Sequence, residues 1–471
     1  MTNMKRPIHH AGLCALLVVT AAAMISSCSP GEEASPSEQG SPDRLSYTCS
    51  AANLSPVDAE KEAISIMCTL KPGSLRGIDA IKAEVTPLYG GQPSALRSAE
   101  EADAPLAYLV NFKDNNGFAI LSANRNCPPI LAIHPHGNLD PEKAPDNPTL
   151  QMLMERVEEY CLASNEHSKT VPDPMHPYNP DGTPIAELHK VEFGPWEEII
   201  SERREALIPV VWGQSEAPYN SNLCKRYGYS VHAGCATAAV AQIAAFHRYP
   251  KMVDGYQLDW DIMLMHHSLD APNIENEEAY PYISKLYEVI GDKLGVKYSA
   301  KSSGAAKENI RPTLVELGFR SVGDLEDYEY EKIKKEMEAD DQSGYPVLIC
   351  AYAYKTPNKK HFLWWKWEGR PKYDEGHAFV LDGVTKMRRK VSYYTKYDMP
   401  EDKWTLLRSA YEYIHLVRAN LGWDSNYFNG YYYEGIFDTN RGPQLRVTDS
   451  REGDDHCFQY NMQIIKGIRV K

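Results

Sequence analysis

The sequence lacks several features that would define a class of function. No two cysteines have CxxC spacing, so we expect no metal site, and nothing implies an organic cofactor. There is no concentrated stripe of Lys and Arg, and the formal net charge is −14, which argues against nucleic acid as a partner. No internal repeat is found. Beyond residue 28, no segment is long and apolar enough to cross a membrane.

The N-terminus has the pattern of an export signal. Lys5 and Arg6 precede an apolar stretch at residues 11–25, which is too short to span a bilayer comfortably. Residues 25–28 resemble a bacterial lipobox, in which Cys28 would be lipidated and become the new N-terminus. The alternative is ordinary signal cleavage with Cys28 incidental. We expect a signal peptide at residues 1–27 and a polar tether at 28–44, rich in Ser, Pro and Glu.

These features predict an exported bacterial lipoprotein of the cell envelope. The lipid would hold the protein on the outer membrane, with the folded part facing either the periplasm or the outside. The N-terminal lipid is the only contact with a membrane that the sequence implies.

The length of 471 residues predicts at least two domains. The first has a mixed α/β pattern, with helices at residues 56–68 and 152–161. An Asn-Gly step at 116–117 separates apolar runs at 106–112 and 118–122, which predicts a hairpin. A stretch rich in Pro and Gly follows at residues 167–184, and we interpret it as a linker. The alternative is a long surface loop within one domain.

The remainder predicts helices first and then an antiparallel sheet, which is an α+β order. The clearest helix is the alanine-rich segment at residues 234–247, and others are expected at 277–294 and 309–317. Strand-like runs then follow at residues 345–352, 377–384, 413–417, 430–437 and 462–470.

Four residues could form a catalytic centre. Cys235 begins the alanine-rich helix, where the helix terminus favours a reactive thiolate, although such a cysteine is more often a small buried apolar residue. His377 heads a strand between glycines and could act as its base, although a histidine in such a position is more often structural. Asn420 is the leading candidate to orient the imidazole. Gln214 could complete an oxyanion hole with the Cys235 backbone N–H.

These motifs together resemble the streptopain family of papain-like cysteine peptidases. The similar segments are the nucleophile helix at 233–250, the Trp-Gly-Gln segment at 212–214, the histidine strand at 376–383, the region from 420 to 431, and the strand pair of an inhibitory prodomain at 115–122. They occur in family order. The resemblance covers the chain from about residue 45 to the end.

The resemblance implies a papain-like fold and a zymogen that hydrolyses proteins or peptides. It implies a prodomain at residues 45–165, which is an intramolecular inhibitor, a linker at 166–208 holding the processing site, and a peptidase domain at 209–471. The basic pair Arg203 and Arg204 is a possible site of this proteolytic processing. The implied catalytic residues are Cys235 as nucleophile, His377 as proton shuttle, Gln214 in the oxyanion hole and Asn420 orienting His377. The implied substrate-binding residues are Ser302, Ser303, Gly304 and Trp423.

The sequence departs from the family pattern in two places. Leu421 stands where the family often has a Trp beside the orienting Asn, so the apolar shield there is expected to be thinner. An insertion at residues 354–375 carries several aromatic residues; it is either a loop that narrows substrate choice or an aromatic patch packed on the domain. We interpret His247 and Asp382 as structural.

Two other functions stay open. A surface lipoprotein could keep the papain-like fold as a binding module without catalysis. Alternatively, the Cys–His pair could cut cell-wall peptides rather than proteins.

Overall fold

The computed structural model describes most of the chain beyond the N-terminal tether. The described residues are 47–49, 53–71, 82–89, 105–143, 145–168, 188–266, 277–300, 303–340, 343–353, 376–396, 404–439 and 460–470. The predictions that concern Cys28, Ser302 and the insertion at 354–375 therefore lie outside the described residues.

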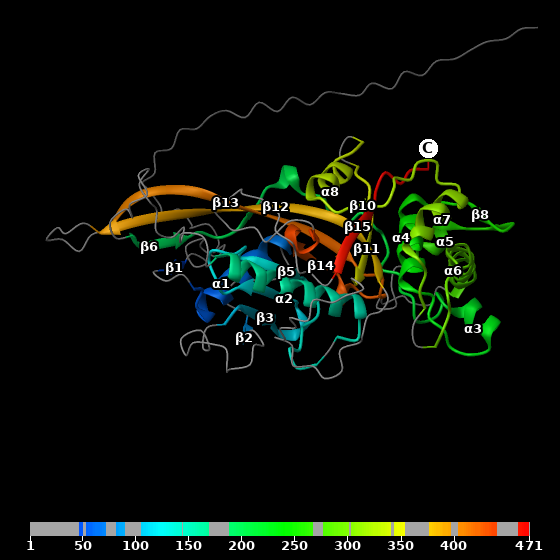
Figure 1. Ribbon diagram of the computed structural model, residues 1–471, viewed down its shortest axis with the longest axis horizontal. Coiled ribbons are helices and arrows are strands. Elements are labelled where there is room, and N and C mark those ends of the chain that lie inside the picture. Colours follow the sequence, from blue (N-terminus) through cyan, green and yellow to red (C-terminus); the bar gives the residue numbers. More distant parts are fainter. Residues whose placement is uncertain are drawn as a thin grey trace, which may run out of the picture. The chain divides into compact units, whose positions relative to one another are not determined.

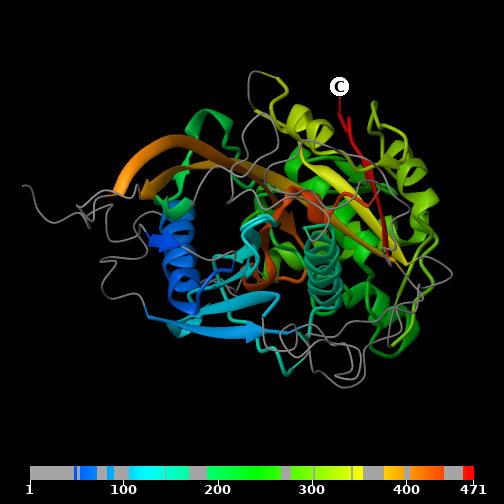
Figure 2. The same cartoon turned by 60° about the vertical axis from the view of Figure 1, so that its left-hand side comes forward.

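The N-terminal unit combines two helices with an antiparallel meander. Its elements are α1 (Pro56–Leu70), β2 (Ala83–Leu88), β3 (Ala107–Phe112), η4 (Lys113–Asn115), β4 (Phe118–Ser122), β5 (Ile130–His134) and α2 (Pro148–Ser168). Ser55 caps α1 by accepting a hydrogen bond from the Asp58 N–H at 3.1 Å. Figure 2 shows α1 lying against the strands of this meander. The predicted hairpin is confirmed.

A glycine sets the turn of that hairpin. Gly117 has a φ of +109°, and an added Cβ would lie 2.1 Å from the His134 carbonyl oxygen. Only glycine combines this backbone conformation with so close an approach.

The helices of the C-terminal part gather beside the sheet. They are α3 (Ser221–Tyr227), α4 (Cys235–His247), α5 (Trp260–Met263), α6 (Tyr280–Leu294), α7 (Ile310–Glu316) and α8 (Tyr330–Met337), with a small hairpin of β8 (Met252–Val253) and β9 (Tyr256–Gln257). Figure 1 shows α4 to α7 grouped together, and α4 packs against both β11 (Val347–Ala353) and β12 (His377–Lys396). The alanines of α4 are buried, because small side chains allow the close approach of its neighbours.

Apart from β8 and β9, the described strands form one antiparallel sheet. Its order is β10 (Glu326–Asp327), β15 (Tyr460–Ile465), β11, β12, β13 (Trp404–Asn420), β14 (Gly430–Tyr433), β5, β4, β3 and β2, with β1 (Tyr47–Cys49), β6 (Leu188–Phe193) and β7 (Glu197–Glu198) joined along β12. Short 3-10 turns complete the described part: η5 (Ile200–Glu202), η6 (Glu277–Ala279), η7 (Lys307–Asn309), η8 (Asn426–Phe428) and η9 (Glu434–Ile436). The α+β class is confirmed.

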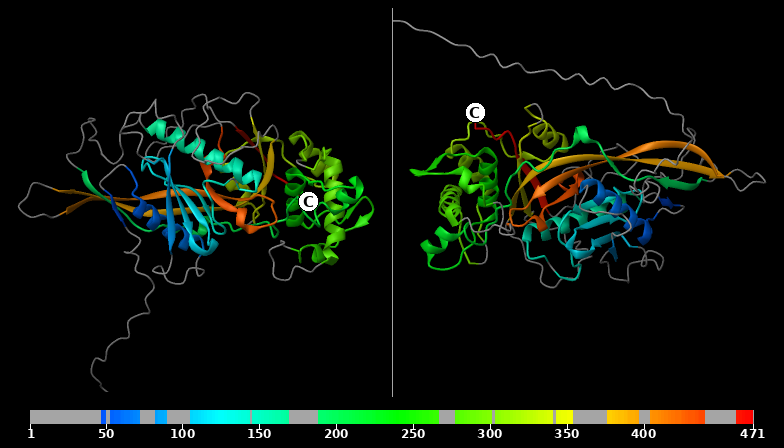
Figure 3. Two further views of the ribbon diagram at one scale, coloured as in Figure 1. Left: turned by 90° about the horizontal axis from the view of Figure 1, so that it is seen from below. Right: turned by 180° about the vertical axis from the view of Figure 1, so that it is seen from behind.

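The hairpin of β12 and β13 is much longer than the sequence indicated. The two strands stay paired from Val380 and Asn420 out to Lys396 and Trp404, and Figure 3 shows them running side by side. Pairing with β6 and β7 supports the outer half of β12. Its many Lys and Arg residues hide the strand pattern, because a strand supported by neighbours tolerates charged side chains on its exposed face.

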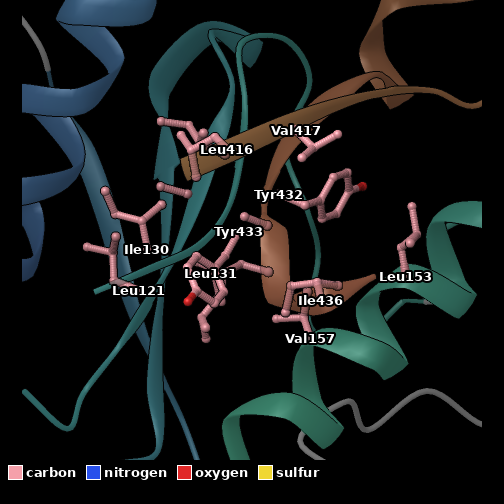
Figure 4. Close-up of a cluster of buried hydrophobic side chains, with 14 of the residues drawn as sticks. Leu121, Ile130, Leu131, Leu153, Val157, Leu416, Val417, Tyr432, Tyr433 and Ile436 are labelled. Atoms are coloured by element: carbon pink, nitrogen blue, oxygen red, sulfur yellow. The ribbon is translucent and has the colours of Figure 1, made fainter. Parts of the chain in front are cut away.

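Residues of both parts of the chain meet in one hydrophobic cluster, while the helical part has a second cluster of its own. Strand β14 pairs with β5 of the N-terminal unit, so the sheet continues from one part into the other. Figure 4 shows side chains from β4, β5 and α2 meeting those of β13, β14 and η9. Ile130 and Leu153 are buried together with Leu416 and Ile436 in this cluster. The predicted domain boundary is thus crossed by continuous packing.

The expected linker contains ordered sheet in its described portion. Helix α2 extends to Ser168, and β6, within the range 166–208, pairs with both β1 and β12. Arg204 exchanges backbone hydrogen bonds with Val384 at 2.7 and 3.1 Å. A cut at this basic pair would require the segment to leave the sheet first. Within the described residues, no helix has both the length and the apolar character needed to traverse a bilayer.

Candidate active site

The candidate nucleophile lies at the first position of α4. Gly234 precedes it with a φ of +93°, and an added Cβ there would lie 2.9 Å from the Ser303 carbonyl oxygen. Glycine is therefore required at this turn. Cys235 itself is partly buried. The N-terminus of α4 places a partial positive charge beside the sulfur, which favours the thiolate.

The structure brings the Cys235 sulfur to the head of β12. The Ala378 N–H donates a hydrogen bond to Cys235 Sγ at 3.4 Å, and the thiol donates to the Gly376 carbonyl at 3.9 Å. These two residues flank His377, so its imidazole is within side-chain reach of the thiol. The N–H donor stabilises negative charge on sulfur in addition to the helix terminus.

Burial controls the protonation of His377. Desolvation lowers the pKa of His377 to about 4, because the charged imidazolium loses its hydration. At pH 7 the ring is therefore neutral in this state. Burial therefore disfavours the charged ring that a thiolate–imidazolium pair requires.

The segment that carries Gln214 is held at successive carbonyl groups. Tyr287 Oη donates to the Gly213 carbonyl at 2.9 Å, and the Ala233 N–H donates to the Gln214 carbonyl at 2.7 Å. Ala233 is two residues before Cys235. The backbone of Gln214 therefore lies beside the loop that leads into the nucleophile, and its role in an oxyanion hole stays a prediction.

Asn420 is completely buried, and its side chain bonds to groups other than His377. Its Nδ2 donates to the Val210 carbonyl at 2.9 Å. Its Oδ1 accepts from Gln242 Nε2 at 3.1 Å and from the Gly422 N–H at 3.3 Å. These contacts place Asn420 between the sheet and α4. Its role in orienting His377 stays a prediction.

The described substrate-binding candidates lie on two sides of this centre. Ser303 approaches Gly234 through its carbonyl, and the backbone of Gly304 pairs with that of Lys297. On the other side, the residues Trp423 and Asp424 pack against Gly213 so closely that an added Cβ would lie 2.8 Å from Asp424 Cβ. Their binding roles stay predictions.

Several neighbours of the thiol were not singled out from the sequence. Cys350 lies directly opposite Ala378 in β11, and burial raises the pKa of its thiol to about 12, which leaves it unreactive. The Tyr352 ring lies against Gly376, where an added Cβ would be 2.5 Å away. No sequence signal distinguishes these residues, because their proximity arises from strand register.

The two residues interpreted as structural have structural contacts. His247 lies at the far end of α4 among the rings of Phe319 and Tyr345, and burial lowers its pKa to about 4. Asp382 is completely buried and accepts a hydrogen bond from Arg418 at 2.6 Å across the β12–β13 pair. In the described portion of the chain, no cluster of three or more metal-ligating side chains is found.

The N-terminal unit docks on β14 through a buried histidine. His134 Nε2 lies 2.8 Å from Tyr432 Oη, and its ring stacks on Phe118 with centroids 4.3 Å apart. The ring occupies the space over Gly430, where an added Cβ would lie 2.4 Å from it. Nearby, Arg156 of α2 donates two hydrogen bonds to the Ile436 carbonyl. Polar and apolar contacts both hold this junction.

A thiol at the N-terminus of a helix, facing a strand that begins with histidine, is typical of one class of enzyme. It is the arrangement of a cysteine peptidase with a papain-like fold, in which a helical part and an antiparallel sheet contribute one catalytic residue each.

The sequence comparisons place the chain within that class. Residues 212–432 match the Peptidase C10 family, and residues 74–161 match the Spi protease inhibitor family. The chain therefore belongs to the Peptidase C10, or streptopain, family of cysteine peptidases and carries an inhibitor-like prodomain. No curated protein matches it.

Two solved structures are similar to the chain. A fragment of Prevotella intermedia prointerpain A is 17% identical, with a TM-score of 0.48, and the match covers 83% of this chain and 100% of that one. The active wild-type interpain A cysteine protease of Prevotella intermedia is 19% identical, with a TM-score of 0.35, and the match covers 57% of this chain and 96% of that one.

The junction histidine predicts that prodomain docking depends on pH. Burial, together with the smaller effect of nearby Arg418, lowers the pKa of His134 to about 3, against about 6.5 for a free histidine. The docked state binds the proton less well. Docking is therefore strongest above pH 6.5 and weakens as the pH falls toward 3. Linkage gives a loss of about 25-fold in docking between pH 7 and pH 5.

Hydrogen exchange on the Cys235→Ala chain measures this loss. The amides of β5 and β14, corrected for the intrinsic effect of pH, should exchange faster at pH 5 than at pH 7. In a His134→Gln variant that difference should largely disappear. Equal protection at both pH values in the parent would rule out the histidine as the cause.

Proposed function

We propose that the chain is the zymogen of an exported, lipid-anchored cysteine endopeptidase that hydrolyses proteins. The observation that carries the proposal is the Cys235 sulfur, held between Gly376 and Ala378 at the N-terminus of α4. A buried structural cysteine needs no such setting. Family membership supports peptide hydrolysis as the reaction.

In this mechanism the Cys235 thiolate attacks the carbonyl carbon of the scissile bond. The C–S bond forms, and negative charge moves to the carbonyl oxygen, where the Cys235 N–H and Gln214 stabilise it. As the intermediate collapses, the C–N bond breaks and protonated His377 gives its proton to the leaving amine.

Water completes the reaction. The product of the first half is a thioester, and the now neutral His377 takes a proton from the attacking water. The C–S bond breaks, the acid leaves and the thiolate–imidazolium pair is restored. Asn420 is proposed to keep the imidazole in place during both proton transfers.

Latency is proposed to come from the prodomain. It is supported by the β5–β14 pairing, by the hydrophobic packing that the two parts share and by the lowered pKa of His377. Removal of the prodomain would have to rehydrate the imidazole and raise its pKa toward the range in which an ion pair forms.

A casein digestion assay tests the proposed activity. Purified chain starting at Ser29 should shorten to a C-terminal fragment of roughly 260–310 residues, consistent with one peptidase domain, and then digest casein. If the N-terminal unit is trimmed by an added protease and casein still remains intact, the proposal fails. In that case the binding-module alternative is favoured.

The cell-wall alternative is separated by substrate. Peptidoglycan fragments and casein are offered to the same activated enzyme. Cleavage of casein alone supports the proposal, whereas cleavage of the peptidoglycan peptides alone replaces it.

The proposed anchor rests on the sequence at the N-terminus. The apolar stretch at 11–25 followed by Ser26, Ser27 and Cys28 supports export and lipidation at Cys28, with the protein on the outer membrane and facing either the periplasm or the outside. A Cys28→Ser variant is expected to leave the membrane fraction and to lose incorporation of labelled fatty acid. A parent protein without label would refute the lipid anchor but not the peptidase.

A further inference from the structure

Gln242 occupies a buried position on the nucleophile helix. It follows Cys235 by seven residues, so both side chains lie on one face of α4, with Gln242 about 10 Å further along the axis. Its side chain is completely buried. Burying a primary amide costs free energy unless its polar atoms are hydrogen-bonded. Among the described residues only the amide nitrogen of Gln242 is hydrogen-bonded, whereas its Oε1 is buried without a partner. The two bonds of the nitrogen therefore indicate which groups the side chain holds.

The amide bonds to two parts of the candidate active site. Gln242 Nε2 donates to the Trp212 carbonyl at 3.1 Å and to Asn420 Oδ1 at 3.1 Å. The Trp212 carbonyl can only accept, so the amide nitrogen must face it. One side chain thus links the nucleophile helix, the oxyanion segment and the predicted orienting residue.

The hydrogen bond from Gln242 also determines the orientation of the Asn420 side-chain amide. Its Nδ2 is directed at the Val210 carbonyl, and its Oδ1 receives both Gln242 and the Gly422 N–H. Two donors therefore converge on this amide oxygen. The rotation of the Asn420 amide is therefore fixed from the α4 side of the sheet.

We propose that Gln242 is a positioning residue for catalysis, which holds Asn420 and the oxyanion segment at fixed distances from Cys235. The proposal rests on the proposed function of the Cys235–His377 pair and extends it. Gln242 touches neither substrate nor the reacting atoms. It acts through the two groups that do the orienting.

The expected kinetic signature follows from this indirect role. Oxyanion donors and the imidazole must lie within fractions of an ångström of their places in the transition state, whereas ground-state binding tolerates small shifts. Loss of the Gln242 donors should thus lower kcat by about 10- to 100-fold and leave KM within about threefold.

Two variants, each produced as the full chain and then activated by removal of the N-terminal unit, measure this effect. Gln242→Met keeps the volume and removes both donors. Gln242→Glu keeps the shape, and its protonated form can serve one acceptor, so its kcat should lie between those of Gln242→Met and the parent. Thr237→Val is the matched control on the same helix: the Thr237 hydroxyl is buried and, among the described residues, has no hydrogen-bond partner. Its kcat should be unchanged.

A double-mutant cycle separates positioning from general stability. If Gln242 acts through Asn420, the double variant Gln242→Met with Asn420→Ala should be no slower than the slower single variant. Independent structural losses would multiply instead and would overturn the proposal. Thermal unfolding identifies any variant that is poorly folded, and Gln242→Glu then supplies the comparison.

The outcomes distinguish the positioning role of Gln242 from the proposed peptidase function on which it rests. An active parent with both Gln242 variants at parental kcat overturns the positioning role alone. A parent that stays inactive refutes the proposed peptidase function and the positioning role with it. A KM that rises while kcat stays constant would assign Gln242 to substrate binding and also contradict the proposal.

Discussion

Replacing Cys235 with alanine is expected to lower the rate of casein hydrolysis by at least about 10⁴-fold. The thiol is the only group placed to form the acyl intermediate in the proposed mechanism, and alanine leaves the oxyanion donors without a nucleophile. The side chain removed is small and partly buried, so the thermal unfolding temperature should change by only a few degrees. Self-processing of the zymogen should stop as well.

Cys224→Ala is the matched control. Cys224 is likewise a partly buried cysteine in the helical part, and its thiol donates a hydrogen bond to the Val231 carbonyl at 3.9 Å. This variant should process and digest casein at the parental rate. If Cys235→Ala retained activity while Cys224→Ala lost it, the nucleophile would have been misassigned.

Replacing Arg389 with leucine is expected to release the prodomain. Arg389 of β12 is almost completely buried and forms an ion pair with Glu62 of α1 at 3.0 Å. Its guanidinium also lies 4.5 Å from the ring centroids of Phe193 and Trp196. Removing it takes the cation away from the buried Glu62 carboxylate and also from Glu412 of β13, which Arg389 Nε binds at 2.7 Å. Breaking a buried ion pair typically costs about 3–5 kcal/mol.

The functional consequence is a less latent zymogen. A penalty of that size would increase the population of the undocked state by roughly 100-fold or more. Processing, followed by intact mass against time, should begin correspondingly sooner, while the mature enzyme should keep its kcat.

Arg388→Leu is the adjacent control for this prediction. Arg388 points to the exposed face of the same strand and pairs at 3.2 Å with Glu197, which is itself exposed. Exposed ion pairs contribute about 0–1 kcal/mol, so the time course should be nearly that of the parent. Equal acceleration by both variants would show that the hairpin as a whole, rather than the buried ion pair, controls latency.

Local signals made part of this architecture predictable. The helix of α4 follows from consecutive alanines, and the β3–β4 hairpin follows from an Asn-Gly step between apolar runs. The family and the fold class were recognisable because the Cys, His and Asn motifs occur in order along the chain. Each of these features depends on neighbouring residues and is therefore visible without tertiary structure.

The rest depends on which strands become neighbours. The length of the β12–β13 hairpin could not be predicted, because its outer half is supported by β6, which lies in what the sequence presented as a linker. The shared core at β5 and β14 joins residues almost 300 positions apart. Such pairings are set by topology rather than by local pattern.

The candidate site shows the same division. The sequence predicted four catalytic residues, whose roles stay predictions, but it did not indicate the hydrogen bonds of Asn420. Gln242 stood within the recognised helix motif, and its spacing of seven residues from Cys235 placed both on one face. Only the structure shows that this face meets Asn420 and Trp212.

Selective alkylation of the activated enzyme tests most directly whether Cys235 is the catalytic nucleophile. Iodoacetamide is applied at pH 6, where an ordinary thiol with a pKa of about 8.5 is almost entirely protonated. Peptide mapping and the casein assay follow the same samples. If Cys235 is the nucleophile, it should be modified first, and activity should fall in proportion to its labelling. Activity that survives full labelling of Cys235, or disappears while Cys235 is unmodified, would contradict its role as the nucleophile.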